Sequence, residues 1–198
     1  MEVQAPFNIA PYLPATLTAP ELTEAEFLAF CQQFPDSMLE YSGDGTLIIM
    51  PPTDPETGKL TLLIVRKLAE WAETQGLGSV VGPDASFRFR NGSRRSPDAA
   101  WFNEERWQKT RKGAGRYPVF APEFVIELRS PEDKLRLLQE KMEEYIENGV
   151  QLAWLINPAG RTVTIYRPGR APEVLSNPTS VRGEGPVEGF ELFLDRIL

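Results

Sequence analysis

The sequence predicts an α/β (α+β) domain with a mixed central sheet, whose core runs helix, three strands, helix, strand. Two long segments, residues 59–74 and 130–148, carry apolar residues at helical spacing. Short apolar runs rich in β-branched and aromatic residues lie between and after them, as is typical of strands. Cap and turn residues mark the junctions, and 198 residues are enough for one full hydrophobic core.

The N-terminal part contains an arm and a first short helix. Residues 1–20 hold four prolines and no apolar periodicity, which predicts an extended arm ahead of a single domain over residues 21–198. Thr23, with Glu26 three positions later, is typical of a capping box. A helix is therefore expected to begin there and to end before Pro35.

A β-hairpin follows this helix. Residues 38–41 and 46–50 have the composition of strands and flank the turn sequence Gly43-Asp44-Gly45. Residues 51–58, which are rich in proline, are expected to form a loop.

The first core helix is expected over residues 59–74, because its apolar residues fall on one face and Gly76 provides a stop. Strand candidates follow at residues 79–81, 86–90, 98–102 and 123–128. Phe87 and Phe89 alternate with arginines, so one face of that strand is apolar and the other is basic. Residues 103–121 are expected to be a surface excursion.

The second core helix has a clear start signal in Ser130-Pro131-Glu132-Asp133, with serine as N-cap and proline at the first helical position. The helix is expected to reach Asn148, before Gly149, and residues 151–156 form a buried strand. A β-rich C-terminal extension has strands at 162–166, 173–175 and 190–194. This order is that of a restriction-endonuclease-like αβββαβ core, although periodicity alone allows other α/β arrangements.

The absence of certain residue types excludes whole classes of chemistry. The chain has no histidine, which removes histidine-based triads, histidine general bases and histidine-ligated zinc. With Cys31 as its one cysteine, a metal site must use oxygen ligands, which favours Mg²⁺ or Mn²⁺. The lone cysteine and the lack of a membrane-length apolar run predict a cytoplasmic protein without membrane association.

The net charge of −7 argues against a protein that coats nucleic acid by bulk electrostatics. The charge is unevenly distributed, because residues 88–116 carry +6 and the remainder carries −13. This basic band is expected either to hold a phosphate backbone or to be an ordinary solvated loop. The candidate nucleic-acid-binding residues in it are Arg88, Arg90, Arg94, Arg95, Lys109 and Lys112.

Two acids stand in otherwise apolar, strand-like runs. Asp98 follows Pro97 at the start of one run, and Glu127 lies within another. A buried carboxylate is costly unless a cation or several donors compensate it, so two on neighbouring strands predict a divalent-cation site. The alternatives are that Asp98 caps a turn and that Glu127 pairs with an arginine.

A lysine on the second core helix is the candidate third member of the site. Lys141 lies on the flank of the apolar stripe, where its methylenes can follow the core and its ammonium can approach Glu127. Helical geometry equally allows an ordinary boundary lysine. Arg129, two residues after Glu127, is a poor proton carrier, so the lysine role is assigned to Lys141 rather than to Arg129.

The sequence also resembles a known family. Residues 124–133 (FVIELRSPED) and 154–158 (WLINP) look like the Uma2 family of restriction-endonuclease-like proteins, which is abundant in cyanobacteria. Residues 50–53 (MPPT) and 95–101 (RSPDAAW) fit its pattern too. The resemblance covers residue 21 to the end of the chain.

The resemblance implies a PD-(D/E)xK-type nuclease fold with Asp98, Glu127 and Lys141 at the active-site positions. It also implies Glu40 as a further metal ligand beside the acid pair. Asn157 departs from the family pattern, as does the missing histidine before the first core helix. The second departure is expected to lower or alter activity.

Two functions from different classes are therefore predicted. The first is a Mg²⁺- or Mn²⁺-dependent endonuclease that hydrolyses phosphodiester bonds in DNA, as a homodimer because two strands must be cut. The second is a catalytically weak or inactive module that keeps the nuclease fold and binds nucleic acid or a protein partner. The missing lysine at position 129 and the acidic composition favour the second.

Overall fold

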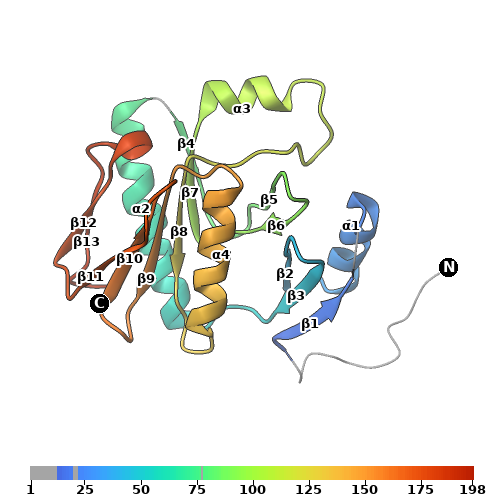
Figure 1. The fold of residues 1–198 in the computed structure, drawn as a ribbon, viewed down its shortest axis with the longest axis horizontal. Coiled ribbons are helices and arrows are strands. Elements are labelled where there is room, and N and C mark those ends of the chain that lie inside the picture. The colour runs from blue at the N-terminus through green and yellow to red at the C-terminus, as the bar shows by residue number, and fades with distance from the viewer. Residues whose placement is uncertain (1–12, 20–21, 77) are drawn as a thin grey trace.

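A six-stranded mixed sheet forms the centre of the molecule. The computed structural model describes residues 13–19, 22–76 and 78–198, and helices α2 and α4 cover opposite faces of this sheet (Figure 1). The strand order is β11-β10-β9-β8-β7-β4. The strands are β4 (Gly78–Val81), β7 (Ala99–Asn103), β8 (Phe124–Leu128), β9 (Leu152–Asn157), β10 (Thr162–Tyr166) and β11 (Glu173–Ser176), and the helices are α2 (Pro55–Gln75) and α4 (Leu135–Glu147).

The chain runs through this sheet in the predicted order. From α2 it passes through β4, β7 and β8, then through α4 to β9. Strands β8 and β9 are parallel, as the helical crossover requires, whereas the other pairs are antiparallel. The predicted αβββαβ core with a mixed sheet is thus confirmed.

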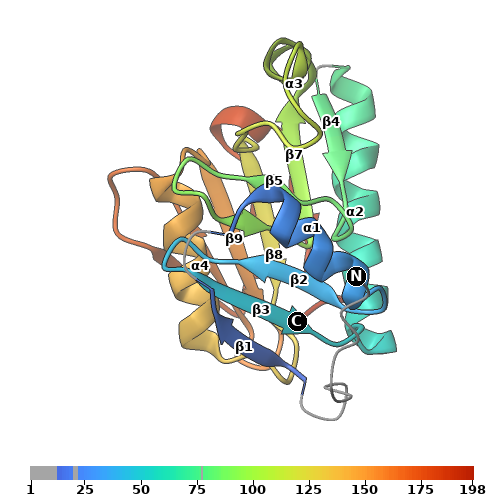
Figure 2. The same ribbon diagram turned by 90° about the vertical axis from the view of Figure 1, so that its right-hand side faces the viewer.

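A second sheet of five strands packs beside the first, with the order β1-β3-β2-β6-β5 (Figure 2). Its strands are β1 (Ala15–Thr18), β2 (Met38–Tyr41), β3 (Thr46–Met50), β5 (Phe87–Arg88) and β6 (Arg94–Arg95), and helix α1 (Glu24–Gln33) covers it. The predicted hairpin of β2 and β3 and the capping box at Thr23 are both confirmed. Residues 1–12 of the predicted arm lie outside the described residues, and its later part forms β1, paired with β3.

The segment 86–90 belongs to this second sheet, not to the central one. Only Phe87 and Arg88 form strand β5, because the chain turns back at Gly92, where φ is +86°. The predicted alternation holds, since Phe87 and Phe89 are buried while Arg90 is exposed.

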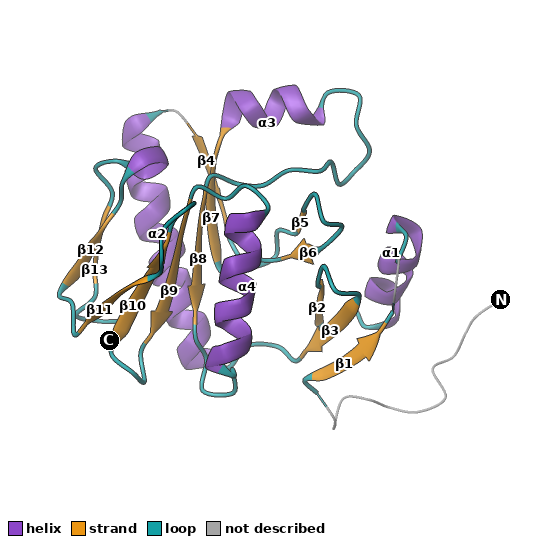
Figure 3. Cartoon of the chain, in the orientation of Figure 1, coloured by secondary structure: helices purple, strands orange, loops and turns teal. Residues whose placement is uncertain are grey.

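The core lies on both faces of the central sheet. Every residue of β8 and β9 is buried, as expected where helices cover both faces. On the α2 face, Trp154 stacks on Phe190 with ring centroids 5.6 Å apart. The C-terminal extension closes this side with strands β12 (Ser180–Arg182) and β13 (Glu191–Phe193) (Figure 3).

Two helices differ from their predicted bounds, and a third, α3, was not predicted. Helix α2 begins four residues early, because Asp54 caps it through the amides of Glu56 and Thr57. Helix α4 begins at Leu135 instead of residue 130, since the Asp133 carboxylate closes a separate turn by accepting from the Ser130 amide. The excursion 103–121 contains a helix, α3 (Glu104–Arg111), capped by the side chain of Asn103.

Alanine substitutions at two glycines, one inside α2 and one at its C-terminal end, should change stability in opposite directions. Gly58 lies in the helix with open space around the site of a Cβ, so Gly58→Ala should stabilise by about 0.5–1 kcal/mol. Gly76 ends the helix at φ +65°, so Gly76→Ala should destabilise by roughly 1 kcal/mol. Thermal unfolding would show shifts of about 2–4 °C in opposite directions. Shifts of the same sign would contradict this account.

Candidate functional site

The two acids predicted as metal ligands lie side by side. Ala99 of β7 pairs with Ile126 of β8, and continuing this antiparallel register by one residue sets Asp98 opposite Glu127. Residues directly opposite each other project from the same face of a sheet. The Leu128 amide donates to Asp98 Oδ2 at 2.7 Å, which fixes Asp98 against the end of β8. As predicted, the two segments are neighbours in the sheet, but Glu127 lies within β8 whereas Asp98 immediately precedes β7.

Burial disfavours the charged form of both acids. It raises the pKa of Asp98 to about 6, although the Leu128 amide and Lys141 act in the opposite direction. Burial also raises the pKa of Glu127 to about 8, against the attraction of Lys141, and the negative charges of Asp98 and Glu40 add to the rise. Positive charge placed between the two acids would stabilise both carboxylates.

Lys141 of α4 joins Glu127 to a third acid. Its Nζ lies 2.8 Å from Oε1 of Glu127 and 2.8 Å from Oε1 of Glu40 on strand β2. Burial would lower the lysine pKa, but the two carboxylates raise it above its ordinary value. Lys141 is thus an inward-facing, ion-paired residue, and the alternative of an ordinary boundary lysine does not hold.

Tyr145 lies one helical turn after Lys141 and contacts the same carboxylate. Its hydroxyl donates to Glu127 Oε1 at 2.8 Å, and the side chain is fully buried. Burial raises the pKa of Tyr145 well above its ordinary value, so the hydroxyl keeps its proton. Helical periodicity places Tyr145 in the apolar stripe of α4 and does not mark it as a site residue. Its i, i+4 spacing from Lys141 was the signal that could have linked the two.

Both carboxylate oxygens of Glu40 contact donor groups of the protein. Oε1 accepts from the Ser96 amide at 2.9 Å as well as from Lys141, and Oε2 lies 3.2 Å from Arg95 Nη1. Burial opposes the charged form, but Lys141 and Arg95 outweigh it and hold the pKa of Glu40 below its usual value. The arrangement makes Glu40 a partner of two cations, and its role as a metal ligand stays a prediction.

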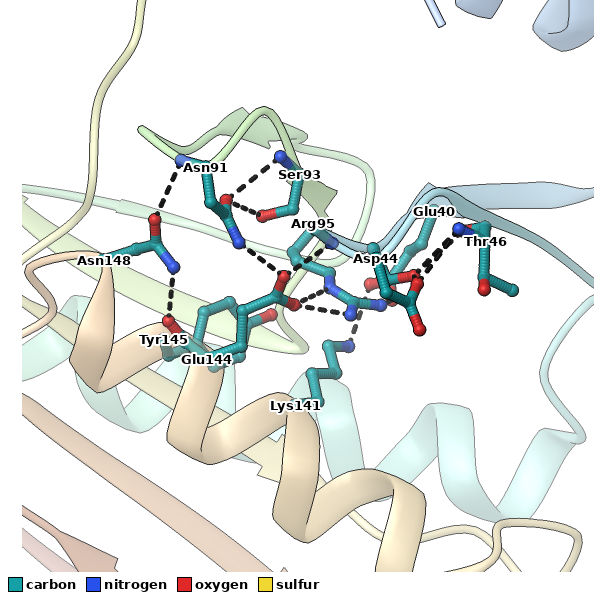
Figure 4. A network of polar contacts seen from close by, with 12 residues as sticks. Glu40, Asp44, Thr46, Asn91, Ser93, Arg95, Lys141, Glu144, Tyr145 and Asn148 are labelled. Atoms are coloured by element: carbon teal, nitrogen blue, oxygen red, sulfur yellow. Dashed lines mark hydrogen bonds and ion pairs between the residues drawn. The ribbon is translucent and has the colours of Figure 1, made fainter. Parts of the chain in front are cut away.

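Glu144 fastens the second sheet to α4 (Figure 4). Its carboxylate accepts from the Gly43 amide and the Asn91 side chain, each at 2.8 Å, and pairs with Arg95 at 2.5 Å. Helical periodicity places Glu144 opposite the apolar stripe and predicts that it faces water. This prediction is wrong, because the second sheet packs against this face of the helix. A Cβ at Gly43 would lie 2.2 Å from Asn91 Nδ2, so a larger residue there would displace the Asn91 side chain from this contact.

The residues of the predicted basic band fall into a buried group and an exposed group. Arg94 and Arg95 are buried, and Arg94 packs on the ring of Phe27 while Arg95 pairs with the acids of the cluster. This placement does not support their predicted role as phosphate-backbone contacts. Arg90, Lys109 and Lys112 are exposed, and Arg88 is partly exposed, so their binding role stays a prediction. Arg129 contacts Asp133 and Asn157, leaving Lys141 as the cation beside Glu127.

The donor set of the cluster suits a hard divalent cation. Glu40, Asp98, Glu127 and Glu144 face two basic groups, so full ionisation leaves an excess of two negative charges. Carboxylate oxygen is the ligand that Mg²⁺ and Mn²⁺ prefer. Within the described part of the chain, no three acidic or cysteine side chains already surround a common point as ligands. Asp98 and Glu127 therefore fit as a pair of ligands, to be completed by substrate or water.

Comparison with known proteins agrees with this architecture. The model of a family named Uma2 and described as "Putative restriction endonuclease" matches residues 24–195. A crystal structure of "a putative nuclease belonging to DUF820" from Anabaena variabilis ATCC 29413 superposes with a TM-score of 0.73 at 21% identity. The match covers 89% of this chain and 97% of that one, and the restriction-endonuclease-like fold is thus confirmed. No curated protein matches the chain. Among the helices of residues 13–19, 22–76 and 78–198, none combines the length and the hydrophobicity of a transmembrane span.

Removing the buried ammonium should destabilise the protein in a pH-dependent way. Lys141→Met leaves Glu40 and Glu127 without their shared cation, a change that typically costs about 3–5 kcal/mol. Glu40 keeps its contact with Arg95, whereas Glu127 can escape the penalty by taking up a proton. Urea unfolding should therefore show a larger deficit at about pH 8 than at about pH 5. Lys134→Met, at an exposed lysine, is the control, and equal deficits at both pH values would contradict the assignment.

Asp98 should lower stability as it ionises. Its folded pKa of about 6 lies above the ordinary 3.8, so its contribution is complete below 3.8 and is lost as the pH rises through about 6. Asp98→Asn should therefore gain in melting temperature relative to wild type between about pH 4.5 and about pH 7.5, measured in EDTA. The control is Asp44→Asn, because hydrogen bonds from Ser42 and Thr46 lower the pKa of that acid. A gain in melting temperature by both variants, or by neither, would contradict the raised pKa of Asp98.

Proposed function

The chain belongs to the Uma2 family, and we propose that it is a Mg²⁺- or Mn²⁺-dependent endonuclease that hydrolyses phosphodiester bonds in DNA. One observation carries the proposal: the buried Glu127 and the partly buried Asp98, both with raised pKa values, stand opposite each other beside the largely buried ammonium of Lys141. This is the set of groups that phosphodiester hydrolysis with a divalent ion requires.

Asp98 and Glu127 are the residues that would hold the ion. A divalent cation there supplies positive charge to the phosphoryl oxygens and makes water a stronger acid. Glu127 belongs to β8 and Asp98 immediately precedes β7, where the Leu128 amide donates to Asp98 and the Tyr145 hydroxyl donates to Glu127 Oε1. The contacts described for Glu127 are all made by Oε1, which leaves Oε2 for a ligand.

Lys141 acts as a fixed positive charge. Because Glu40 and Glu127 raise its pKa, the amine stays protonated at neutral pH and does not serve as a general base. Its ammonium can instead donate to a phosphate oxygen or to the attacking water and offset charge that develops during hydrolysis. Glu40 and Arg95 hold the ammonium in place from the second sheet.

DNA as substrate, a homodimeric state and a cytoplasmic location belong to the same proposal. The exposed Arg90, Lys109 and Lys112 offer contacts to phosphates despite the net charge of −7. Two copies of the chain would supply the two sites needed to cut both strands. The lone Cys31, which forms no disulfide, suits a reducing compartment.

Cleavage of a labelled DNA duplex in Mg²⁺ or Mn²⁺ tests the proposal. Asp98→Asn and Glu127→Gln should each lower the rate by at least about 100-fold, and EDTA should abolish cleavage. The apparent metal affinity should rise with pH, because protons compete with the ion at groups whose pKa values are about 6 and about 8.

Glu140→Gln is the matched control, since this exposed acid lies on α4 and pairs only with Arg136 among the described residues. Cleavage in EDTA, or cleavage that survives both acid substitutions, would refute the proposal. Binding of DNA without turnover under either ion would favour the alternative of a non-catalytic module.

A further inference from the structure

A cavity of about 310 Å³ opens beside Asp98. It lies between the first half of α2 and the loop that follows β4, and its lining includes Gly58, Thr61 and Val65 of the helix and Pro83 of the loop. Both ribbon views place the start of α2 at the end of the sheet where β8 ends (Figures 1 and 2). The cavity volume is at the lower end of the roughly 300–1,000 Å³ found for small-molecule sites.

The lining suits an uncharged group. Among the described residues, the lining contains no lysine or arginine and Asp98 is its one charged residue, so a free phosphate would meet an acid without a compensating cation. Leu62, Val65 and Pro83 supply apolar surface, which is compatible with the faces of an aromatic ring or a sugar.

One polar side chain in the lining lacks a partner. Thr61 is only 6% exposed, and its hydroxyl makes no hydrogen bond within the described residues. A buried hydroxyl without a partner costs free energy, and most buried polar groups in proteins are paired. A helical threonine can usually bond the carbonyl four residues earlier, so the unpaired hydroxyl points to a ligand that completes it.

We propose that this cavity binds the nucleoside moiety attached to the scissile phosphate, with Thr61 donating to or accepting from it. The inference rests on the proposed function for the identity of the substrate. A phosphate held at Asp98 carries its sugar through a single ester oxygen and the base on that sugar, and the cavity is the adjoining space that accepts an uncharged, partly apolar group. The catalytic cluster then recognises the phosphate while the cavity recognises the nucleoside.

Binding of free nucleosides tests this without requiring cleavage. Deoxynucleosides and deoxynucleoside 5′-monophosphates would be titrated into the full-length protein, and the backbone amide signals of Gly58, Thr61 and Gly82 followed by NMR. These signals should shift in a saturable way with nucleosides and not with inorganic phosphate. Thr61→Val should weaken binding by about 2- to 10-fold, the range for the loss of one hydrogen bond.

Gly58→Leu should abolish binding, because open space surrounds the position of its Cβ and the longer side chain would fill the slot. Controls on the same helix are Thr74→Val and Gln75→Leu, both at exposed sites outside the cavity. Melting temperatures and the Mg²⁺-induced thermal shift would establish that each variant is folded with its acid pair intact.

The outcomes separate this inference from the proposed function. Saturable, Thr61-dependent nucleoside binding without DNA cleavage would support nucleoside binding in the cavity and refute the proposed nuclease activity. Cleavage without nucleoside binding, or binding unchanged by Gly58→Leu, would refute nucleoside binding in the cavity and leave the proposed nuclease activity intact. Shifts caused equally by inorganic phosphate would also refute it, because the ligand would then be the anion.

Discussion

The buried ammonium of Lys141 is the interaction on which the site depends. It pairs at 2.8 Å with Glu127 of the central sheet and with Glu40 of the second sheet. Each carboxylate alone would be costly to bury, and neither strand carries its own compensating cation at this point. The cluster therefore exists only while both sheets are packed against α4, which couples the geometry of the site to the assembly of the whole domain.

The second sheet supplies part of the charged cluster and is held against α4. It delivers Glu40 and Arg95, and it is held to α4 by Glu144 through the turn at Gly43 and the side chain of Asn91. Most of these contacts are charge-assisted hydrogen bonds, which are directional and fix side-chain orientation. The sheet thus acts as a support that holds the ammonium toward the acid pair, while the central sheet fixes the acids themselves.

The order of the core elements could be predicted from the sequence because each element has a recognisable local pattern. Apolar periodicity indicated α2 and α4, and the continuous apolar runs of β8 and β9 indicated strands covered on both faces. Boundaries were less predictable where one residue type serves two purposes. Asp133 belongs to a segment typical of a helix start, but its side chain closes a turn before the helix. Asp54 lies in a proline-rich segment that was expected to be a loop, yet it caps a helix.

For the site, the sequence by itself determined which groups are available: two acids in apolar strands, one lysine on a helix flank, and no histidine. These are local properties, since a lone charge in an apolar run is unusual wherever it occurs. Only the tertiary structure decided which charged side chains pair with one another. Arg95 and Glu144 have ordinary surface-like sequence contexts, yet they lie in the cluster because segments 49 residues apart meet there. Long-range pairing depends on the packing of two sheets against one helix, and nothing in the local sequence encodes that packing.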